Sequence, residues 1–300
     1  LPANNPALKL DALKKLLAVE DARFKLEVVR TLRFSPHDGT QALLLEIAKD
    51  EKQDATLRAE AVSGLDAGTK ETRQLLTDLA TGTDATLQLE ALRALRGAEF
   101  NEVEREFLSR SSSAHKELAE TIGLALGKVV GERPSAEDTA AWVKLLDGAK
   151  PQAAGDDAAK KQATAGERVF FSSKAAGCYR CHTVAGRGGV TGPDLSTIGG
   201  ALSRQRLIES ILQPSKEIAP RFSSHLIETD AGDRLTLMYV GPSPDGRQIW
   251  ADSNGKEILL SHGEIISKKP LESSIMPADL HKAMTIREMA ELVAFLERLK

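Results

Sequence analysis

An internal repeat restricts the fold of about the first 130 residues to stacked pairs of helices. Three segments align, each with a leading aspartate and apolar residues at helical spacing: 21–32 (DARFKLEVVRTL), 54–65 (DATLRAEAVSGL) and 84–95 (DATLQLEALRAL). A weaker copy follows at 115–126. The three aspartates are 33 and 30 residues apart, and a second helix-like segment lies between successive copies. Such a period of paired helices is typical of an α-solenoid.

The repeated positions have definite structural roles in this interpretation. The aspartates Asp21, Asp54 and Asp84 stand where helix N-caps belong, and we expect them to accept bonds from the first free N–H groups. Apolar side chains at helical spacing are expected to form one shared core: Leu26, Val29, Leu32, Ala59, Val62, Leu65, Leu89, Leu92 and Leu95. These segments resemble HEAT-type repeats, and packing without chemistry is the simplest role for them.

The amino-acid composition and the pattern of apolar residues change after residue 147. The segment 147–162 is rich in Ala, Gly, Asp, Lys and Gln without an apolar period, which predicts a linker running into a helix. We therefore expect a repeat domain over 1–147, a linker over 148–163 and a second domain over 164–300. In that domain, a helix before residue 177 carries Gly166, Val169 and Phe170 on one face.

A small antiparallel sheet is expected at about 222–270. Alternating or apolar runs there are punctuated by Ala-Gly-Asp, Pro-Asp-Gly and Ser-Asn-Gly, which are turn signals between about four strands. Pro242 and Pro244 interrupt one hairpin and leave its pairing open. The last helix, 285–300, opens with a Thr285/Glu288 capping box. The fold class predicted for the whole chain is mainly α with this β insertion.

Composition excludes some classes of partner. Aromatic residues make up 4% of the chain, which favours helical packing by Leu and Ala. The net charge is −3, and neither half has the basic excess of a nucleic-acid-binding protein. No apolar run approaches the ~18 residues of a membrane span. The first residues, LPANNPALKL, lack the basic and apolar regions of a secretory signal, which we expect to be absent or removed.

The two cysteines of the chain lie together, at Cys178 and Cys181, with His182 directly after them. A disulfide over two intervening residues would be strained and would leave the histidine unexplained. A redox dithiol favours a βαβ setting, and a structural zinc needs four ligands. Covalent haem c uses all three residues: two thioethers to the vinyl groups and one imidazole to the iron. Haem is therefore the preferred interpretation.

The glycine-rich segment 186–195 follows this motif. Its glycines are expected to let the backbone approach the macrocycle closely. Pro193 keeps a carbonyl that would accept the second imidazole N–H and fix the tautomer of His182. A plain turn proline is the alternative interpretation of Pro193.

Met276 is the expected sixth ligand of the iron. It lies in a loop before Pro277, and a residue before proline is disfavoured in a helix. A lone thioether in such a loop is unusual unless it binds a soft metal. Met238 falls in a strand pattern, and Met284 and Met289 fall at the last helix, where methionine usually fills core. The remaining histidines are expected at the surface or in turns, with His281 the strongest rival: His37, His115, His225, His262 and His281.

Cationic side chains are needed for the haem propionates, because carboxylates against protein require polar partners. Arg204 and Arg206 follow the glycine-rich loop, and Arg187 lies within it. Ordinary solvation at the surface is the alternative role for these three arginines.

Four segments resemble the cytochrome-c-type haem-binding domain of planctomycetes and verrucomicrobia, over about 166–300. They are GERVFFSSKAAGCYRCHTVAGRGGVTGPDLSTIGG, LIESILQPSKEIAP, SSIMPADL and TIREMAELVAFLERLK. The resemblance implies a class I cytochrome c-like fold with a small β insertion, preceded by HEAT-like repeats. It also implies thioethers at Cys178 and Cys181, axial His182 and Met276, and Gly166 and Phe170 crossing Leu292 and Phe295 in a terminal helix pair.

The function expected from these features is electron transfer by one haem c, without enzymatic activity. A His/Met pair fills both axial positions and leaves no open site for substrate. The repeats would be a docking platform for a redox partner protein, and covalent haem attachment implies a periplasmic or exported protein. The alternatives are the haem section of a sugar or alcohol dehydrogenase, and a haem sensor of diatomic gas with a labile sixth ligand.

Overall fold

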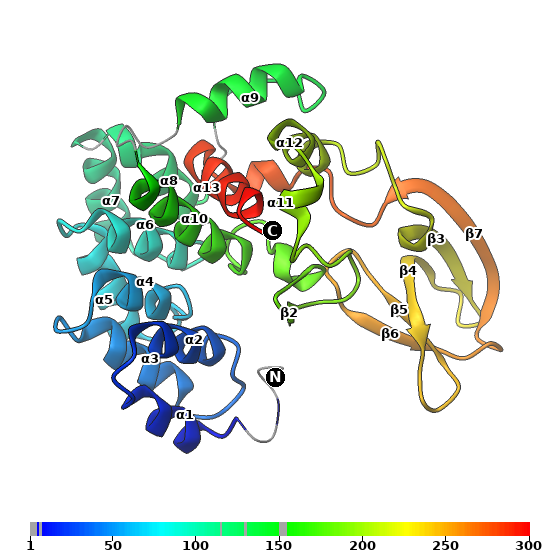
Figure 1. The fold of residues 1–300 in the computed structure, drawn as a ribbon, viewed down its shortest axis with the longest axis horizontal. Helices are drawn as coiled ribbons and strands as arrows, with labels where there is room; N and C mark the ends of the chain where they lie inside the picture. Colours follow the sequence, from blue (N-terminus) through cyan, green and yellow to red (C-terminus); the bar gives the residue numbers. More distant parts are fainter. Residues whose placement is uncertain (1–4, 6–7, 115, 129–130, 150–154) are drawn as a thin grey trace. The chain divides into compact units, whose positions relative to one another are not determined.

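The computed structural model describes residues 5, 8–114, 116–128, 131–149 and 155–300 (Figure 1). Helices take up about half of the chain, with thirteen α-helices in the described residues. The same residues form a five-stranded antiparallel sheet and a two-stranded one made of β1 (Thr183–Val184) and β2 (Arg187–Gly188). The chain divides into two compact units, Leu1–Gly131 and Glu132–Lys300.

The first unit contains helices that pack in sequence order, with α4 in contact with α2, α3 and α6. A 3-10 turn precedes the last helix. The elements are α1 (Leu10–Leu17), α2 (Ala22–Leu32), α3 (Thr40–Lys49), α4 (Ala55–Val62), α5 (Lys70–Ala80), α6 (Ala85–Ala94), α7 (Glu102–Ala114), η1 (Lys116–Leu118) and α8 (Ala119–Ala125).

The three repeated aspartates are N-caps, as predicted. Asp21 caps α2 by accepting from the Phe24 backbone N–H at 2.7 Å. Asp54 accepts from two backbone N–H groups of α4, and Asp84 does the same for α6. The predicted apolar ladder is also confirmed: eight of its members are buried in one core, and Leu26 packs against that core half-buried.

Removing one cap is expected to weaken the first unit measurably. Asp54 bonds the N–H groups of Thr56 at 2.8 Å and Leu57 at 3.1 Å. Asp54→Ala leaves both groups without this acceptor and should lower the free energy of unfolding by about 1 kcal/mol. Urea unfolding followed by circular dichroism measures the loss. Asp54→Asn is the control, since its amide oxygen still caps the helix; equal losses in both variants would contradict this role.

The first unit also buries charge at a repeated position. Glu60 and Glu90 each follow the capping aspartate by six residues and are 1% exposed. Glu60 pairs with Arg33 at the end of α2, and Glu90 pairs with Arg93 at 2.6 Å. These buried ion pairs hold specific helix contacts that the apolar period alone does not define.

The second unit begins earlier than the predicted boundary at residue 147. Helix α9 (Thr139–Gly148) packs against α12 (Arg204–Leu212) and α13 (Ile286–Glu297), so it belongs with the C-terminal elements. The predicted linker over 148–163 is also shorter on its C-terminal side, because helix α10 (Asp156–Phe170) includes its last eight residues. Residues 150–154 of that linker lie outside the described residues.

Helices α10 and α13 cross closely, as the sequence led us to expect. Gly166 lies at the crossing, where a Cβ would be 1.9 Å from the Glu291 carbonyl oxygen. The Phe170 and Phe295 rings pack beside it with centroids 5.7 Å apart. The predicted Thr285/Glu288 capping box starts α13. This crossing holds α10 against the C-terminal helix of the second unit.

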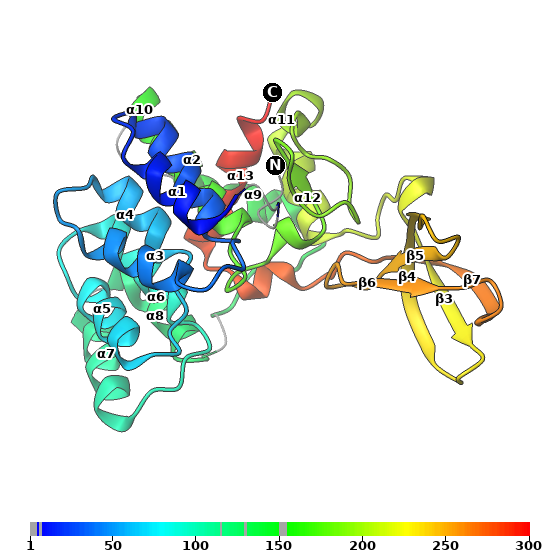
Figure 2. The same ribbon diagram turned by 90° about the horizontal axis from the view of Figure 1, so that it is seen from below.

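The sheet has five antiparallel strands in the order β6-β5-β4-β3-β7, one more than predicted. The strands are β3 (Ser223–Thr229), β4 (Arg234–Pro242), β5 (Gln248–Ala251), β6 (Glu257–Leu260) and β7 (Ile265–Ser274). The last strand, β7, begins within the strand-like run GEIIS (263–267), extends past the predicted end at 270 and pairs with β3. Figure 2 shows the sheet as one layer beside the helices of the same unit.

The hairpin that contains Pro242 and Pro244 does form, with an irregularity in the pairing of its two strands. Pro242 is the last residue of β4 and pairs with Gln248, after a register shift between Tyr239 and Gly241. Pro244 falls in the turn that follows. Both prolines are thereby placed at a strand end or outside the ladder, where a missing N–H costs little.

Candidate haem site

Cys178, Cys181 and His182 lie on a single tight turn. The 3-10 turn η2 (Cys178–Arg180) starts after Gly177, which has φ +64°. The backbone N–H groups of Cys181 and His182 both donate to the Cys178 carbonyl, at 3.2 and 3.0 Å. Both cysteines are free thiols. Burial raises the pKa of Cys178 to about 12, and burial followed by the Asp252 carboxylate raises the pKa of Cys181.

The imidazole of His182 is oriented by Pro193, as predicted. Its Nδ1 lies 2.9 Å from the Pro193 carbonyl oxygen, which can only accept a hydrogen bond. Nδ1 therefore carries the proton, and Nε2 presents a lone pair. Burial lowers the pKa of His182 more than the Pro193 carbonyl raises it, so the ring is neutral at pH 7. This tautomer and charge suit a metal ligand.

The glycine-rich loop packs closely against the cysteine turn. The Gly189 N–H donates to the Tyr179 carbonyl and the Gly192 N–H donates to the Cys181 carbonyl, both at 2.7 Å. A Cβ at Gly192 would lie 2.6 Å from the His182 ring. Small residues are needed here because the loop backbone is in contact with the turn that it holds.

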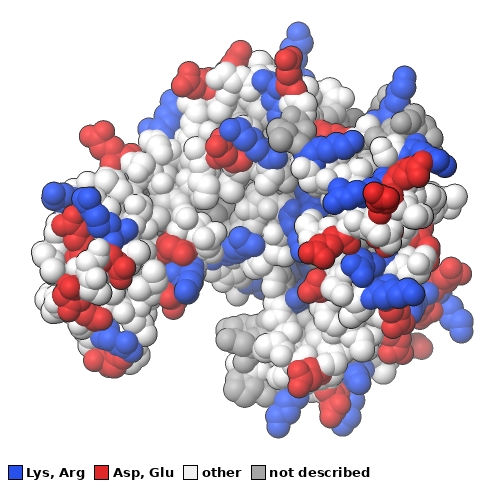
Figure 3. All heavy atoms as spheres, turned by 180° about the vertical axis from the view of Figure 1, so that it is seen from behind, with Lys and Arg blue, Asp and Glu red and all other residues white. Residues whose placement is uncertain are grey.

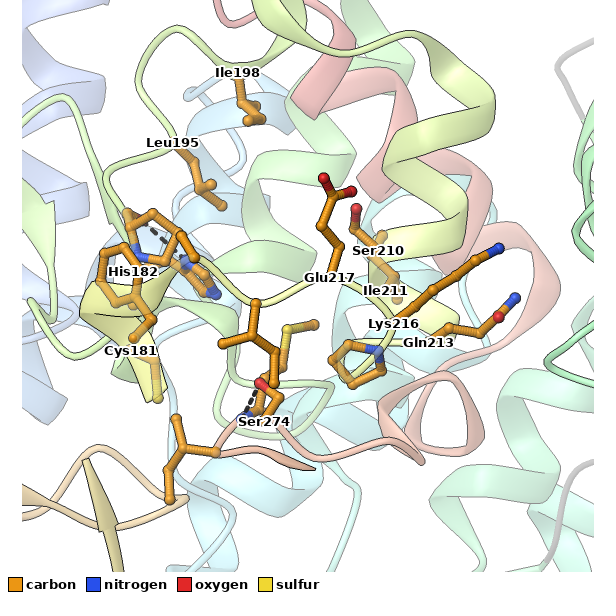
Figure 4. Close-up of a pocket in the computed structure, with 18 of the residues that line it drawn as sticks. Cys181, His182, Leu195, Ile198, Ser210, Ile211, Gln213, Lys216, Glu217 and Ser274 are labelled. Atoms are coloured by element: carbon orange, nitrogen blue, oxygen red, sulfur yellow. Dashed lines mark hydrogen bonds between the residues drawn. The ribbon is translucent and has the colours of Figure 1, made fainter. Parts of the chain in front are cut away.

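A cavity of about 640 Å³ opens beside this turn (Figure 4). Cys181 and His182 lie at one side and Gln213 and Lys216 at the other. The walls between them are mainly apolar: Leu195, Ile198, Leu202, Leu207, Ile211, Ile218, Phe222, Met238, Ile275, Met276 and Leu296. Volume, apolar walls and a neutral imidazole fit a large apolar cofactor.

The cavity brings together five of the seven site residues proposed from sequence: Cys181, His182, Pro193, Arg206 and Met276. Cys178 does not line it, although it belongs to the same turn as Cys181. Arg204 does not line it either. The imidazole of His182 and the thioether of Met276, separated by 94 residues of sequence, thus share one cavity.

A second thioether, from Met238 of β4, also lines the cavity. The strand pattern contained the signal for this placement. Leu235 and Leu237 alternate into the sheet core, so Met238 points from the opposite face. Met284 and Met289 are fully buried elsewhere and are not among the lining residues.

Of the described histidines, only His182 lines the cavity. His281, the predicted rival ligand, is buried edge-on against Trp142 with ring centroids 5.5 Å apart. Its burial lowers its pKa. His225 packs against Trp250, and His262 lies 2.6 Å from the Gln248 amide. His37 bonds the Leu8 carbonyl oxygen, and His115 lies outside the described residues.

The candidate propionate partners differ in position. Arg206 lines the cavity but is already bonded to Glu209 and Glu217, which line it as well. Arg204 pairs with Asp147 at 3.2 Å and Glu297 at 2.6 Å. Arg204 therefore joins elements of the second unit through ion pairs and is not placed to contact a cofactor in the cavity.

Arg187 is also engaged away from the cavity. It pairs with Glu167 at 2.5 Å, and its guanidinium lies 4.4 Å from the centroid of the Phe171 ring. The pair ties the glycine-rich loop to α10. Arg206 is thus the one of the three arginines that faces the site.

On the face drawn in Figure 3, basic and acidic side chains are intermingled. Within the described part of the chain, no helix has both the length and the apolar character required to cross a bilayer. The same residues contain no group of three or more His, Cys, Asp or Glu side chains placed to hold a metal ion. The pair His182 and Met276 falls outside this definition, because it has two members and one of them is a methionine.

Comparison of the sequence with protein-family models and with curated proteins found no match. The assignment of the cavity depends on its own residues and their chemistry.

Proposed function

We propose that this protein is a monohaem c-type cytochrome that carries single electrons between redox partners. The observation that carries the proposal is that His182, Cys181 and Met276 line one apolar cavity, with Cys178 on the same turn. Covalent haem uses two thiols and the adjacent imidazole, and it is the interpretation that gives each of these residues a role.

The two thiols would hold the cofactor covalently. Each S–H adds across one vinyl group, so that sulfur bonds to one carbon and the thiol proton goes to the other. The raised pKa values of Cys178 and Cys181 keep both thiols protonated, and protonated thiols resist oxidation to a disulfide. Bound haem supplies an iron that cycles between the ferrous and ferric states.

His182 and Met276 would hold the iron through an imidazole nitrogen and a thioether sulfur. Nε2 of His182 is available because Nδ1–H is bonded to Pro193. Met276 lies at a bend in the loop after β7, and its N–H donates to the Ser274 hydroxyl at 3.1 Å. With both side chains on the iron and mainly apolar walls around it, access of water and substrates to the metal would be restricted. Such a site favours electron transfer over catalysis.

The helical first unit would serve as a docking platform in this proposal. Its capped and regularly packed helices support a HEAT-like solenoid, and solenoid surfaces generally bind other proteins. The second unit, with α10 crossing α13 beside the cysteine turn, supports a class I cytochrome c-like fold. Haem attachment of this type would place the protein in the periplasm or outside the cell.

Met276→Ala tests the proposed axial ligand. Loss of the thioether should abolish the methionine-to-iron band near ~695 nm in the oxidised protein, and the reduced protein should gain the ability to bind carbon monoxide. Absorption spectra measure both changes. Met284→Leu is the matched control, because Met284 is buried outside the cavity and its loss should leave the band in place. An unchanged spectrum in Met276→Ala would remove Met276 from the iron.

A further inference from the structure

The five-stranded sheet reaches the cavity through the middle of β4. Met238 lines the cavity and is 2% exposed. Its cross-strand partners are Ser224 on β3 and Ala251 on β5, both fully buried. A buried methionine flanked by two small buried residues shows that this face of the sheet is covered. The sheet therefore forms part of the wall of the site.

A second contact joins the sheet to the cysteine turn. Gly255, in the β5–β6 turn, has φ +75°, and a Cβ there would lie 2.3 Å from the Arg180 carbonyl oxygen and 2.9 Å from its carbon. Arg180 lies between Cys178 and Cys181 in the sequence. The backbone of the sheet thus abuts the backbone of the turn, and a side chain at this position would require one of them to move.

The β5–β6 turn is rigid enough to transmit this contact. Asp252 accepts from the backbone N–H groups of Asn254 at 2.8 Å and Lys256 at 2.9 Å, and its carbonyl accepts from the Gly255 N–H at 3.0 Å. On the other side of the contact, the Arg180 N–H bonds the Gly177 carbonyl, and the His182 N–H bonds the Cys178 carbonyl. A shift of Arg180 would therefore move His182 as well.

We propose that the sheet is a structural half of the haem site, with Met238 as its cavity wall and Gly255 as the positioning residue that seats it on the cysteine turn. The proposal rests on the function proposed above. Gly255 acts through the turn and touches neither the reacting atoms nor the cofactor. The sheet sets the geometry of His182, and with it the ligand field and reduction potential of the iron.

Gly255→Ala and Gly246→Ala form a matched pair for the test. Gly246 lies in the β4–β5 turn with φ +88°, and a Cβ there would meet nothing within 4 Å. Both substitutions carry the same kind of backbone strain, and only Gly255→Ala adds a clash with Arg180. In the haem-loaded full chain, Gly255→Ala should shift the reduction potential and weaken the ~695 nm band, while Gly246→Ala leaves both unchanged. Equal effects in the two variants would overturn the proposal.

A second pair of variants tests the same contact if the Gly255→Ala protein cannot be obtained in folded form. Asp252→Ala removes the acceptor that rigidifies the β5–β6 turn, and Asp245→Ala removes the corresponding acceptor of the β4–β5 turn, which bonds the Arg247 N–H at 3.1 Å. Amide hydrogen exchange at residues 179–182 should accelerate in Asp252→Ala only. Unchanged exchange in Asp252→Ala would overturn the proposal.

Met238→Leu tests whether Met238 only lines the cavity or binds the iron. Leucine keeps the volume and removes the sulfur, so the ~695 nm band should persist. Loss of the band would make Met238 the axial ligand and overturn its role as a wall. Amide exchange also separates this proposal from the proposed function. If the native chain bears no porphyrin, electron transfer fails as a function, while exchange at 179–182 still reports the contact with the sheet.

Discussion

A chain in which Cys178 and Cys181 are both alanine is expected to release all of its porphyrin into acidified acetone. The unchanged chain, matured in a host that attaches haem c, should retain it. The reason is that these are the two cysteines of the whole sequence, so no other thiol can form a thioether. Intact mass should show the increment of one porphyrin on the unchanged chain and none on the double variant.

Tyr179→Phe is the control for this experiment, because it changes the residue next to Cys178 and keeps both thiols. Its mass increment should equal that of the unchanged chain. Each single cysteine variant should still hold the cofactor by one bond, since Cys178 and Cys181 lie on the same turn. A porphyrin mass that persists on the double variant, or is missing from the unchanged chain, would refute covalent attachment through this motif.

Local signals in the sequence were sufficient for the elements that form short-range contacts. The caps at Asp21, Asp54 and Asp84 depend on bonds to N–H groups two or three residues away, and they were predictable for that reason. The hydrogen bond from His182 to Pro193 spans only 11 residues, and it was predicted on the expectation that a metal-binding imidazole has such a partner.

Contacts between distant segments were not predictable in the same way. Helix α9 follows the repeats along the chain, and its packing against α12 and α13 assigns it to the second unit. Strand β7 contains Lys268, Lys269 and Pro270, which weaken a strand pattern, yet β3 offers it a full pairing edge. The strand therefore extends beyond the segment that the sequence pattern indicated.

The site residues also divide into those predictable from local sequence and those whose position depends on contacts between distant segments. Cys178, Cys181 and His182 lie within five residues of sequence, so their placement on one turn could be inferred from spacing. Strand alternation places Met238 on the face opposite Leu235 and Leu237, but only the packing of the sheet against the rest of the unit shows that this face meets the cavity. Arg204 and Arg206 are two residues apart, and ion-pair partners brought by folding decide that only Arg206 faces the cavity.

The largest effect on stability is expected at the crossing of α10 and α13. A Cβ at Gly166 would be 1.9 Å from the Glu291 carbonyl oxygen and 2.9 Å from the Phe295 Cβ. The first of these atoms is helix backbone, so it cannot rotate away, and the two helices must separate. Gly166→Ala should therefore lower the free energy of unfolding of the second unit by about 3 kcal/mol or more, despite the higher helix propensity of alanine, worth about 1 kcal/mol.

Tryptophan fluorescence during urea unfolding measures this loss in the second unit alone, because the two tryptophans of the chain, Trp142 and Trp250, are both buried there. Gly148→Ala in α9 is the control, since a Cβ there meets nothing within 4 Å. That variant should keep or raise stability by up to about 1 kcal/mol, since alanine restricts the unfolded chain. If Gly166→Ala unfolds at the same urea concentration as Gly148→Ala, the two helices are not in backbone contact at Gly166, and the crossing that closes the second unit must be placed elsewhere.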